Sequence, residues 1–130
     1  MTTPISSSSS SSDAARIAFV GGGNMARSLI AGLIRQGMPA ANICVAEPVA
    51  DLRQALARDF GVQVVDDART AVAGAATWVL AVKPQVLPAV CAQLADLAQA
   101  GQPLLISIAA GITAMQLQRW SGGNIAVVRA

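Results

Sequence analysis

Short apolar runs alternate along this chain with longer segments in which apolar residues recur at helical spacing. The runs with the length and composition of strands are residues 16–20, 42–46, 62–65, 77–82, 104–108 and 125–128. The segments that we expect to be helices are 24–36, 51–60, 67–73, 84–100 and 113–120. Strands separated by helices favour right-handed crossovers and a parallel sheet with helices on both faces. This alternation of six strands with helices predicts a single α/β domain, a Rossmann-type doubly wound parallel sheet with strand order 3-2-1-4-5-6.

Several residues indicate where the helices begin, end and pack. Asp67 and Thr113 are suited to cap the starts of two helices, and Gly61 is suited to end another. Pro84 suits the first turn of the helix 84–100, because that position needs no backbone N–H. The residues that share one apolar face of the first helix are Met25, Leu29, Gly32 and Leu33.

The composition is apolar for a water-exposed chain, with 54% hydrophobic residues, 12% charged residues and a mean hydropathy of +0.54. A membrane helix would need roughly 20 mainly apolar residues. The longest uncharged stretch, 97–118, is interrupted by glycine, proline and glutamine, so we expect no membrane span. Strands buried on both faces explain the apolarity instead. Phe19 and Trp78, inside predicted strands, are therefore expected in the core.

Charge and the metal-binding residue types exclude other classes of protein. A net charge of +2 with scattered basic residues argues against binding to nucleic acid. The chain has no His, which removes the commonest metal ligand and general base, and we predict no metal site. Cys44 and Cys91 lie in a predicted strand and helix without metal-ligand spacing. We expect them to be buried free thiols in a reducing compartment, which favours the cytoplasm.

The first 14 residues differ in composition from the rest of the chain. They include seven consecutive serines from Ser6 onward, and we expect residues 1–14 to form a disordered tail. Residues 15–130 then form the predicted domain. The chain stops directly after its last predicted strand, so we expect this domain to be a fragment of a longer two-domain protein.

A glycine cluster follows the first predicted strand. Residues 20–26 read VGGGNMA and satisfy the pattern G-x-G-x-x-A through Gly21, Gly23 and Ala26. Gly21 permits a tight turn, Gly23 lets a pyrophosphate approach the backbone, and Ala26 lets the helix pack close to the sheet. An ordinary turn is the alternative explanation. The strand before the cluster and the helix after it favour a dinucleotide site instead, with the pyrophosphate at the helix N-terminus.

An acidic residue, Glu47, ends the second predicted strand. A carboxylate there can accept hydrogen bonds from the adenosine ribose and repel a 2′-phosphate, which favours NADH. The alternative is a solvated carboxylate beside a turn. Arg53, in the next helix, could offset the charge by reaching a phosphate. The cofactor prediction is therefore NADPH or NADH.

Two further segments follow the fourth and fifth predicted strands, where open α/β sheets bind ligands. They are 81–84, which reads AVKP, and 107–111, which reads SIAAG. Small residues there leave room for a flat ring. Lys83 is either part of this site or a surface charge at the end of a strand.

Three segments in order resemble pyrroline-5-carboxylate reductases. These are VGGGNMARSLIAGL at 20–33, LAVKPQV at 80–86 and LISIAAGIT at 105–113, and IAVVRA at 125–130 also matches. The resemblance covers residues 16–130. It implies reduction of 1-pyrroline-5-carboxylate to L-proline by hydride transfer from NAD(P)H, the last step of proline biosynthesis.

The resemblance also implies roles for individual residues. The pyrophosphate would contact Val20, Gly21, Gly23, Asn24 and Met25, and Glu47 would lie near the adenosine ribose. The nicotinamide side would be lined by Ala81, Val82, Lys83, Pro84, Ile108, Ala109 and Ala110. Many members of the family carry Asn near the position of Ala68, so that ribose contact would be missing here.

The segment that contacts the substrate, and the helical domain through which the family forms homo-oligomers, would both lie beyond residue 130. We therefore name no catalytic residue in this chain. Two alternatives are a nucleotide-binding module without turnover and a related β-hydroxyacid dehydrogenase. Val82, Lys83 and Pro84 argue against the dehydrogenase.

Overall fold

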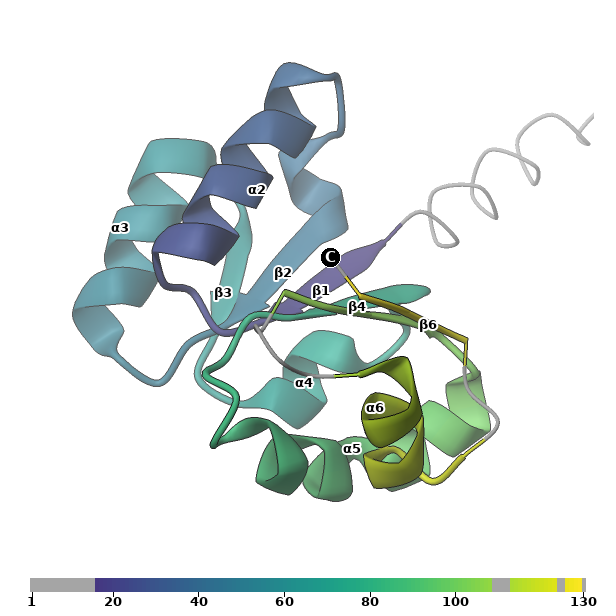
Figure 1. Cartoon of the computed structure of the whole chain (residues 1–130). Coiled ribbons are helices and arrows are strands. Elements are labelled where there is room, and N and C mark those ends of the chain that lie inside the picture. Colours follow the sequence, from purple (N-terminus) through teal and green to yellow (C-terminus); the bar gives the residue numbers. More distant parts are fainter. Residues whose placement is uncertain (1–15, 109–112, 124–125, 130) are drawn as a thin grey trace, which may run out of the picture.

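The computed structural model describes residues 16–108, 113–123 and 126–129. It contains a six-stranded sheet in the order β3-β2-β1-β4-β5-β6, in which all neighbouring strands are parallel (Figure 1). This is the predicted strand order. The strands are β1 (Ile17–Val20), β2 (Ile43–Ala46), β3 (Gln63–Val65), β4 (Thr77–Leu80), β5 (Leu104–Ser107) and β6 (Val127–Arg129).

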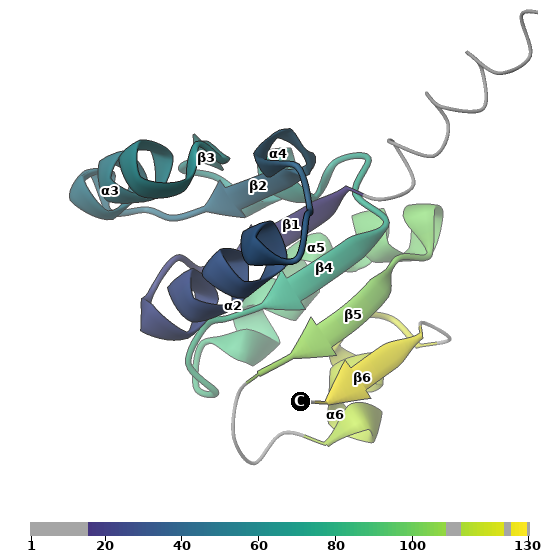
Figure 2. The ribbon, with the colours of Figure 1, turned by 90° about the horizontal axis from the view of Figure 1, so that it is seen from above.

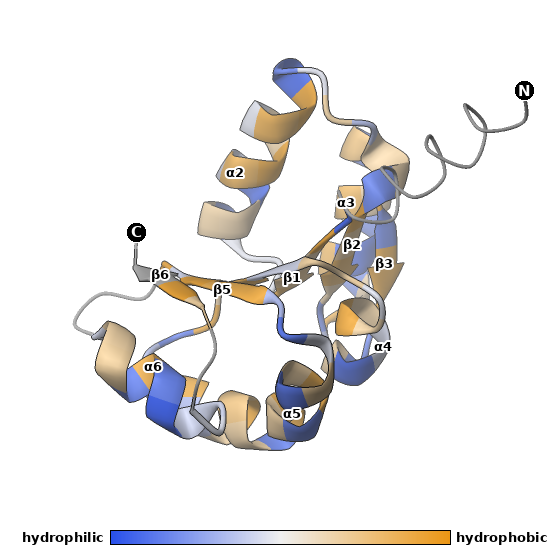
Figure 3. Ribbon diagram, turned by 90° about the vertical axis from the view of Figure 1, so that its right-hand side faces the viewer, coloured by the Kyte–Doolittle hydropathy of each residue, from blue (hydrophilic) through white to orange (hydrophobic). Residues whose placement is uncertain are grey.

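Helices lie on both faces of the sheet. They are α2 (Asn24–Arg35), α3 (Ala50–Phe60), α4 (Ala68–Val72), α5 (Leu87–Gly101) and α6 (Ala114–Trp120), with a short 3-10 helix, η1 (Ala40–Asn42). Helices α2 and α3 cover one face, whereas α4, α5 and α6 cover the other (Figures 2 and 3). This division follows from right-handed crossovers that run in one direction from β1 to β3 and in the opposite direction from β4 to β6.

Each face of the sheet has its own hydrophobic core, because successive strand residues point to opposite sides. Phe19 of β1 packs with Ile30 of α2 and Leu56 of α3, and all three are at most 1% exposed. On the other face, Trp78 and Leu80 of β4 pack with α5 and α6. Burial of strands on both faces explains the high mean hydropathy and confirms the expected core positions of Phe19 and Trp78.

Three of the predicted helix signals, Asp67, Thr113 and Gly61, are confirmed. The Asp67 carboxylate accepts the backbone N–H of Thr70 (3.0 Å) and caps α4. Thr113 and Gln116 form a reciprocal capping box at the start of α6. Gly61 ends α3 with a left-handed φ of +73°. Within the described residues, no helix combines the length and apolarity that crossing a membrane requires.

The predicted boundaries around β4 and α5 are wrong. Strand β4 ends at Leu80 rather than Val82, and α5 begins at Leu87 rather than Pro84. The proline in the first turn of α5 is Pro88. Because Pro88 has no N–H and its ring would clash with the carbonyl of Pro84 four residues earlier, one regular helix cannot include both prolines. Residues 81–86 therefore form a loop at the carboxyl end of β4.

Two other expectations need correction. Strand β6 covers Val127–Arg129 instead of 125–128, and residue 125 lies outside the described residues. In α2 the buried residues are Ala26 and Ile30, whereas the expected core residues Met25 and Leu29 are 60% and 41% exposed. The helix lies over β1 and β2, so its buried stripe is rotated by one residue from the predicted face.

Replacing Gly32 with Ala tests the packing of α2. Gly32 lies inside this helix, and a Cβ there would meet nothing within 4 Å. Gly in a helix interior costs roughly 0.5–1 kcal/mol relative to Ala. We expect Gly32→Ala to raise the free energy of unfolding by about that amount in urea titrations. Gly61→Ala, at a positive φ, should lower it, and a destabilised Gly32→Ala variant would contradict the described environment.

Candidate functional site

A pocket of about 370 Å³ lies where β1 leads into α2 and β4 leads into the loop 81–86. This is the point where the strand order reverses, which is where doubly wound sheets bind ligands. The residues that line it are Gly23, Asn24, Met25, Ala81, Val82, Lys83, Pro84 and Ile108. The structure therefore brings together three separate segments that the sequence singled out.

Gly21 makes the turn at the end of β1. Its φ is +105°, and a Cβ on it would lie 2.6 Å from the carbonyl oxygen of Ala81. Its N–H donates to the carbonyl of Ala46 (2.9 Å), and the N–H of Ala81 donates to the carbonyl of Val20 (2.8 Å). The turn is thus held between β2 and β4, and no side chain fits there.

Gly22 is a residue whose role the sequence analysis missed. A Cβ on it would lie 2.8 Å from the Leu56 side chain and 3.2 Å from the Cβ of Glu47. Its N–H donates to Glu47 Oε1 (2.9 Å). The middle position of the G-x-G pattern imposes no glycine, and only the run of three consecutive glycines pointed to this close approach.

Gly23 differs from Gly21 and Gly22 because no part of the fold requires it to lack a side chain. A Cβ on Gly23 would meet nothing within 4 Å. Gly23 is the N-cap residue of α2, where no side chain caps the helix and no acidic residue lies in the first turn. Unpaired N–H groups at a helix start attract anions, so this end of the pocket fits a pyrophosphate.

Glu47 is only 7% exposed, and both of its carboxylate oxygens bond to the backbone. Oε1 accepts the N–H of Gly22 (2.9 Å) and Oε2 accepts the N–H of Val49 (3.0 Å). The carboxylate therefore braces the glycine turn against the segment that enters α3. Each carboxylate oxygen has a second lone pair, so a further hydrogen bond to a ribose hydroxyl remains chemically possible.

Arg53 holds the backbone beside Glu47. Its Nη1 donates to the carbonyl oxygens of Glu47 (2.8 Å) and Pro48 (3.0 Å). The guanidinium thus lies at the carboxyl end of β2. It fixes the loop into α3 and retains further N–H donors.

The remaining predicted residues differ in where they lie. Val20 is 4% exposed and contributes its carbonyl to the β1–β4 pairing without lining the pocket. Lys83 is exposed at the pocket. Ala109 and Ala110 lie outside the described residues. Ala26 is 1% exposed and lies in the same hydrophobic core as Phe19. This burial agrees with its predicted role of letting the helix pack close to the sheet.

Cys44 and Cys91 are free and buried, as expected. Burial raises the pKa of both thiols, which keeps them protonated and poorly reactive. Among the residues that the structure describes, no three His, Cys, Asp or Glu side chains gather into a potential metal site.

The comparisons with known proteins agree with this geometry. Residues 16–111 match the family described as "NADP oxidoreductase coenzyme F420-dependent". The chain is 49% identical over 114 residues to the pyrroline-5-carboxylate reductase of Pseudomonas aeruginosa, covering 88% of this chain and 41% of that protein. Its Vibrio alginolyticus counterpart is 39% identical over 114 residues, with 88% and 42% covered. The resemblance inferred from the sequence is thereby confirmed.

The same likeness appears among solved structures. A pyrroline-5-carboxylate reductase from Coxiella burnetii superposes with a TM-score of 0.85 at 36% identity, over 88% of this chain and 43% of that one. A Plasmodium falciparum pyrroline carboxylate reductase with NADP bound superposes with a TM-score of 0.75 at 20% identity, which shows the shared fold. It covers 88% of this chain and 41% of that one. This chain therefore spans about two-fifths of the length of these relatives.

Substituting the glycines separately tests their different roles. Gly21→Ala places a Cβ against the Ala81 carbonyl at a positive φ, so we expect it to lower the free energy of unfolding by about 2 kcal/mol or more. Gly23→Ala meets open space and should leave stability nearly unchanged. Urea unfolding of both variants measures the difference. Equal losses in the two variants would contradict the described turn.

Proposed function

Because the chain belongs to the NADP oxidoreductase family described as coenzyme F420-dependent, we propose that it is the dinucleotide-binding part of an NAD(P)H-dependent pyrroline-5-carboxylate reductase. The observation that carries the proposal is the meeting of three family-like segments at one pocket. The 49% identity to a reductase of that name supports the choice of reaction. The proposed product is L-proline.

We assign the pyrophosphate to the turn from Gly21 to Met25. Gly23 leaves the space that a phosphate needs, and the uncapped start of α2 supplies N–H donors. The adenosine ribose would lie beside Glu47, which the glycine turn holds in place. The nicotinamide would lie between the loop 81–84 and Ile108, with Ala109 and Ala110 as further proposed contacts.

When bound, the reduced nicotinamide supplies a hydride to the carbon of the substrate's C=N bond. The residues of this chain contribute positioning, because an apolar wall from Ala81, Val82 and Ile108 orients a flat ring and excludes water. Lys83 adds a positive charge at the rim. No residue of this chain is assigned as the proton donor, and we propose that the substrate contacts and homo-oligomer contacts lie in the remaining part of the longer relatives, as the family resemblance implies.

The preference between NADH and NADPH depends on the charges at the end of β2. The buried carboxylate of Glu47 favours NADH, because a 2′-phosphate would lie near a negative charge. Arg53, anchored at the same strand end, supplies a compensating positive charge. Both cofactors are therefore retained in the proposal. A cytoplasmic location also belongs to it, supported by the two free thiols.

Titration and turnover together test the function. We expect the 130-residue chain to enhance the fluorescence of NADH or NADPH with a saturable dependence on concentration. Joining the chain to the remainder of the Pseudomonas aeruginosa relative should give reduction of pyrroline-5-carboxylate. Nucleotide binding without reduction by this chimera would favour a non-catalytic module. Failure to bind either nucleotide would contradict the cofactor site.

Gly23→Val tests the location of the pyrophosphate. The added side chain would occupy the open space at the start of α2, where the pyrophosphate is proposed to lie. We expect the Kd for the nucleotide to rise at least about tenfold, which corresponds to about 1.4 kcal/mol of binding free energy. The far-UV circular dichroism should stay unchanged. Ala57→Val, on the exposed side of α3, is the matched control and should bind as the original chain does. Unchanged affinity in Gly23→Val would refute this placement.

A further inference from the structure

The Glu47 carboxylate fills a pair of backbone N–H groups that come from two different segments. Oε1 accepts the N–H of Gly22, in the turn after β1 (2.9 Å), and Oε2 accepts the N–H of Val49 (3.0 Å). Val49 is the N-cap residue of the 11-residue helix α3, and its own side chain makes no capping hydrogen bond. Unpaired N–H groups at a helix start attract anions. The chain therefore satisfies an anion-binding position with a carboxylate of its own.

The surrounding backbone holds Glu47 in this position. The residue is only 7% exposed, and its N–H donates to the carbonyl of Val65 at the end of β3 (2.9 Å). A Cβ on Gly22 would lie 3.2 Å from the Glu47 Cβ and 3.3 Å from Oε1. The glycine turn thus packs directly against the carboxylate, and the two hydrogen bonds fix its orientation.

Two further charged side chains lie at the carboxyl ends of β2 and β3. Arg53 donates through Nη1 to the carbonyl oxygens of Glu47 (2.8 Å) and Pro48 (3.0 Å). Asp66 is exposed and directly follows β3, the strand whose Val65 carbonyl accepts the Glu47 N–H. The cation of Arg53 is thus directed at carbonyl oxygens, whereas the carboxylate of Glu47 takes the N–H groups.

The two candidate cofactors differ only at the adenosine ribose. The 2′-hydroxyl of NADH can donate a hydrogen bond to the second lone pair of a carboxylate oxygen. The 2′-phosphate of NADPH carries close to two negative charges, and it needs N–H donors or cations around it. At the end of β2, the N–H groups of Gly22 and Val49 are already taken by a negatively charged group. This arrangement accepts a hydroxyl and disfavours a phosphate.

We propose that Glu47 determines the cofactor specificity of this site, because its carboxylate occupies the N–H groups that a 2′-phosphate would otherwise use. The chain therefore binds NADH in preference to NADPH. This preference rests on the proposed function, which places a nicotinamide dinucleotide in the pocket and retains both cofactors. Arg53 holds the loop into α3 in the original chain, and it becomes a phosphate ligand only when the carboxylate is removed.

The ratio of the Kd for NADPH to the Kd for NADH tests the proposal, measured by nicotinamide fluorescence with the 130-residue chain. We expect a ratio of at least about ten in the original chain. Glu47→Ser frees both N–H groups, so the ratio should fall at least about tenfold. Glu47→Gln keeps the size of the side chain without its charge, so the ratio should fall by a smaller factor, at least about threefold. A loss of bracing that weakens both nucleotides equally leaves the ratio unchanged.

Three controls separate this role from other effects of substitution. Asp51→Asn removes an exposed carboxylate from the first turn of the same helix, and it should change the ratio less than about twofold, because solvent screens that charge. Arg53→Gln added to Glu47→Ser should restore the preference for NADH. Adenosine 2′,5′-bisphosphate and adenosine 5′-monophosphate, which differ only in the 2′-phosphate, should show the same preferences as competitors. Far-UV circular dichroism reports folding, and Glu47→Gln carries the test if Glu47→Ser does not fold.

Equal Kd values for NADH and NADPH in the original chain would overturn the proposal and leave the nucleotide site intact. An unchanged ratio in the folded Glu47 variants would do the same. If Asp51→Asn lowers the ratio as much as Glu47→Ser, net charge sets the preference and the assignment to Glu47 is wrong. Failure of the original chain to bind either nucleotide would contradict the proposed function as well.

Discussion

The close contact between the turn after β1 and the neighbouring strands is the constraint on which the rest of this structure depends. Gly21 lies against the Ala81 carbonyl and Gly22 against Leu56 and Glu47, so neither position has room for a side chain. Because α2 follows this turn directly, the turn determines where α2 begins. It also places the open side of Gly23 beside the loop that follows β4. A fold requirement and the proposed nucleotide site thus share three consecutive residues.

Glu47 extends the same arrangement to the second strand. Its carboxylate is buried and accepts two backbone N–H groups from segments on either side. A buried charge is tolerated when hydrogen bonds of this kind surround it. The residue that the sequence suggested as a ligand contact is therefore also part of the scaffold that shapes the pocket. Arg53 reinforces the loop from the other side.

The strand order and most of the pocket were predictable from the sequence, because both depend on local patterns. Strand and helix periodicity predicted the sheet, and Gly21, Gly23 and the segment 81–84 predicted the pocket. The start of α5 was mispredicted, since the conflict between Pro84 and Pro88 arises only when both are placed in one helix. The exposure of Met25 and Leu29 was also missed. It depends on which strands α2 covers, and residue spacing along one helix does not contain that information.

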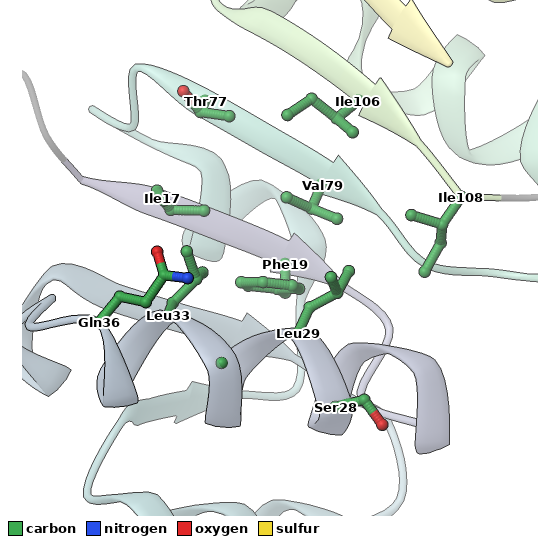
Figure 4. Close-up of a pocket in the computed structure, with 11 residues that line it drawn as sticks. Ile17, Phe19, Ser28, Leu29, Leu33, Gln36, Thr77, Val79, Ile106 and Ile108 are labelled. Carbon is green, nitrogen blue, oxygen red and sulfur yellow. The ribbon is translucent and has the colours of Figure 1, made fainter. Parts of the chain in front are cut away.

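Ile108 lines both the proposed nucleotide pocket and a second cavity beside α2, which Leu29 and Leu33 also line (Figure 4). A nucleotide in the first cavity would therefore touch a side chain that also forms part of the wall of the second. Where an occupant of one cavity shifts such a side chain, binding in the two cavities is linked, and each occupant then changes the affinity of the other by the same factor. Ile108, which directly follows β5, would thereby connect cofactor binding with occupation of the cavity beside α2.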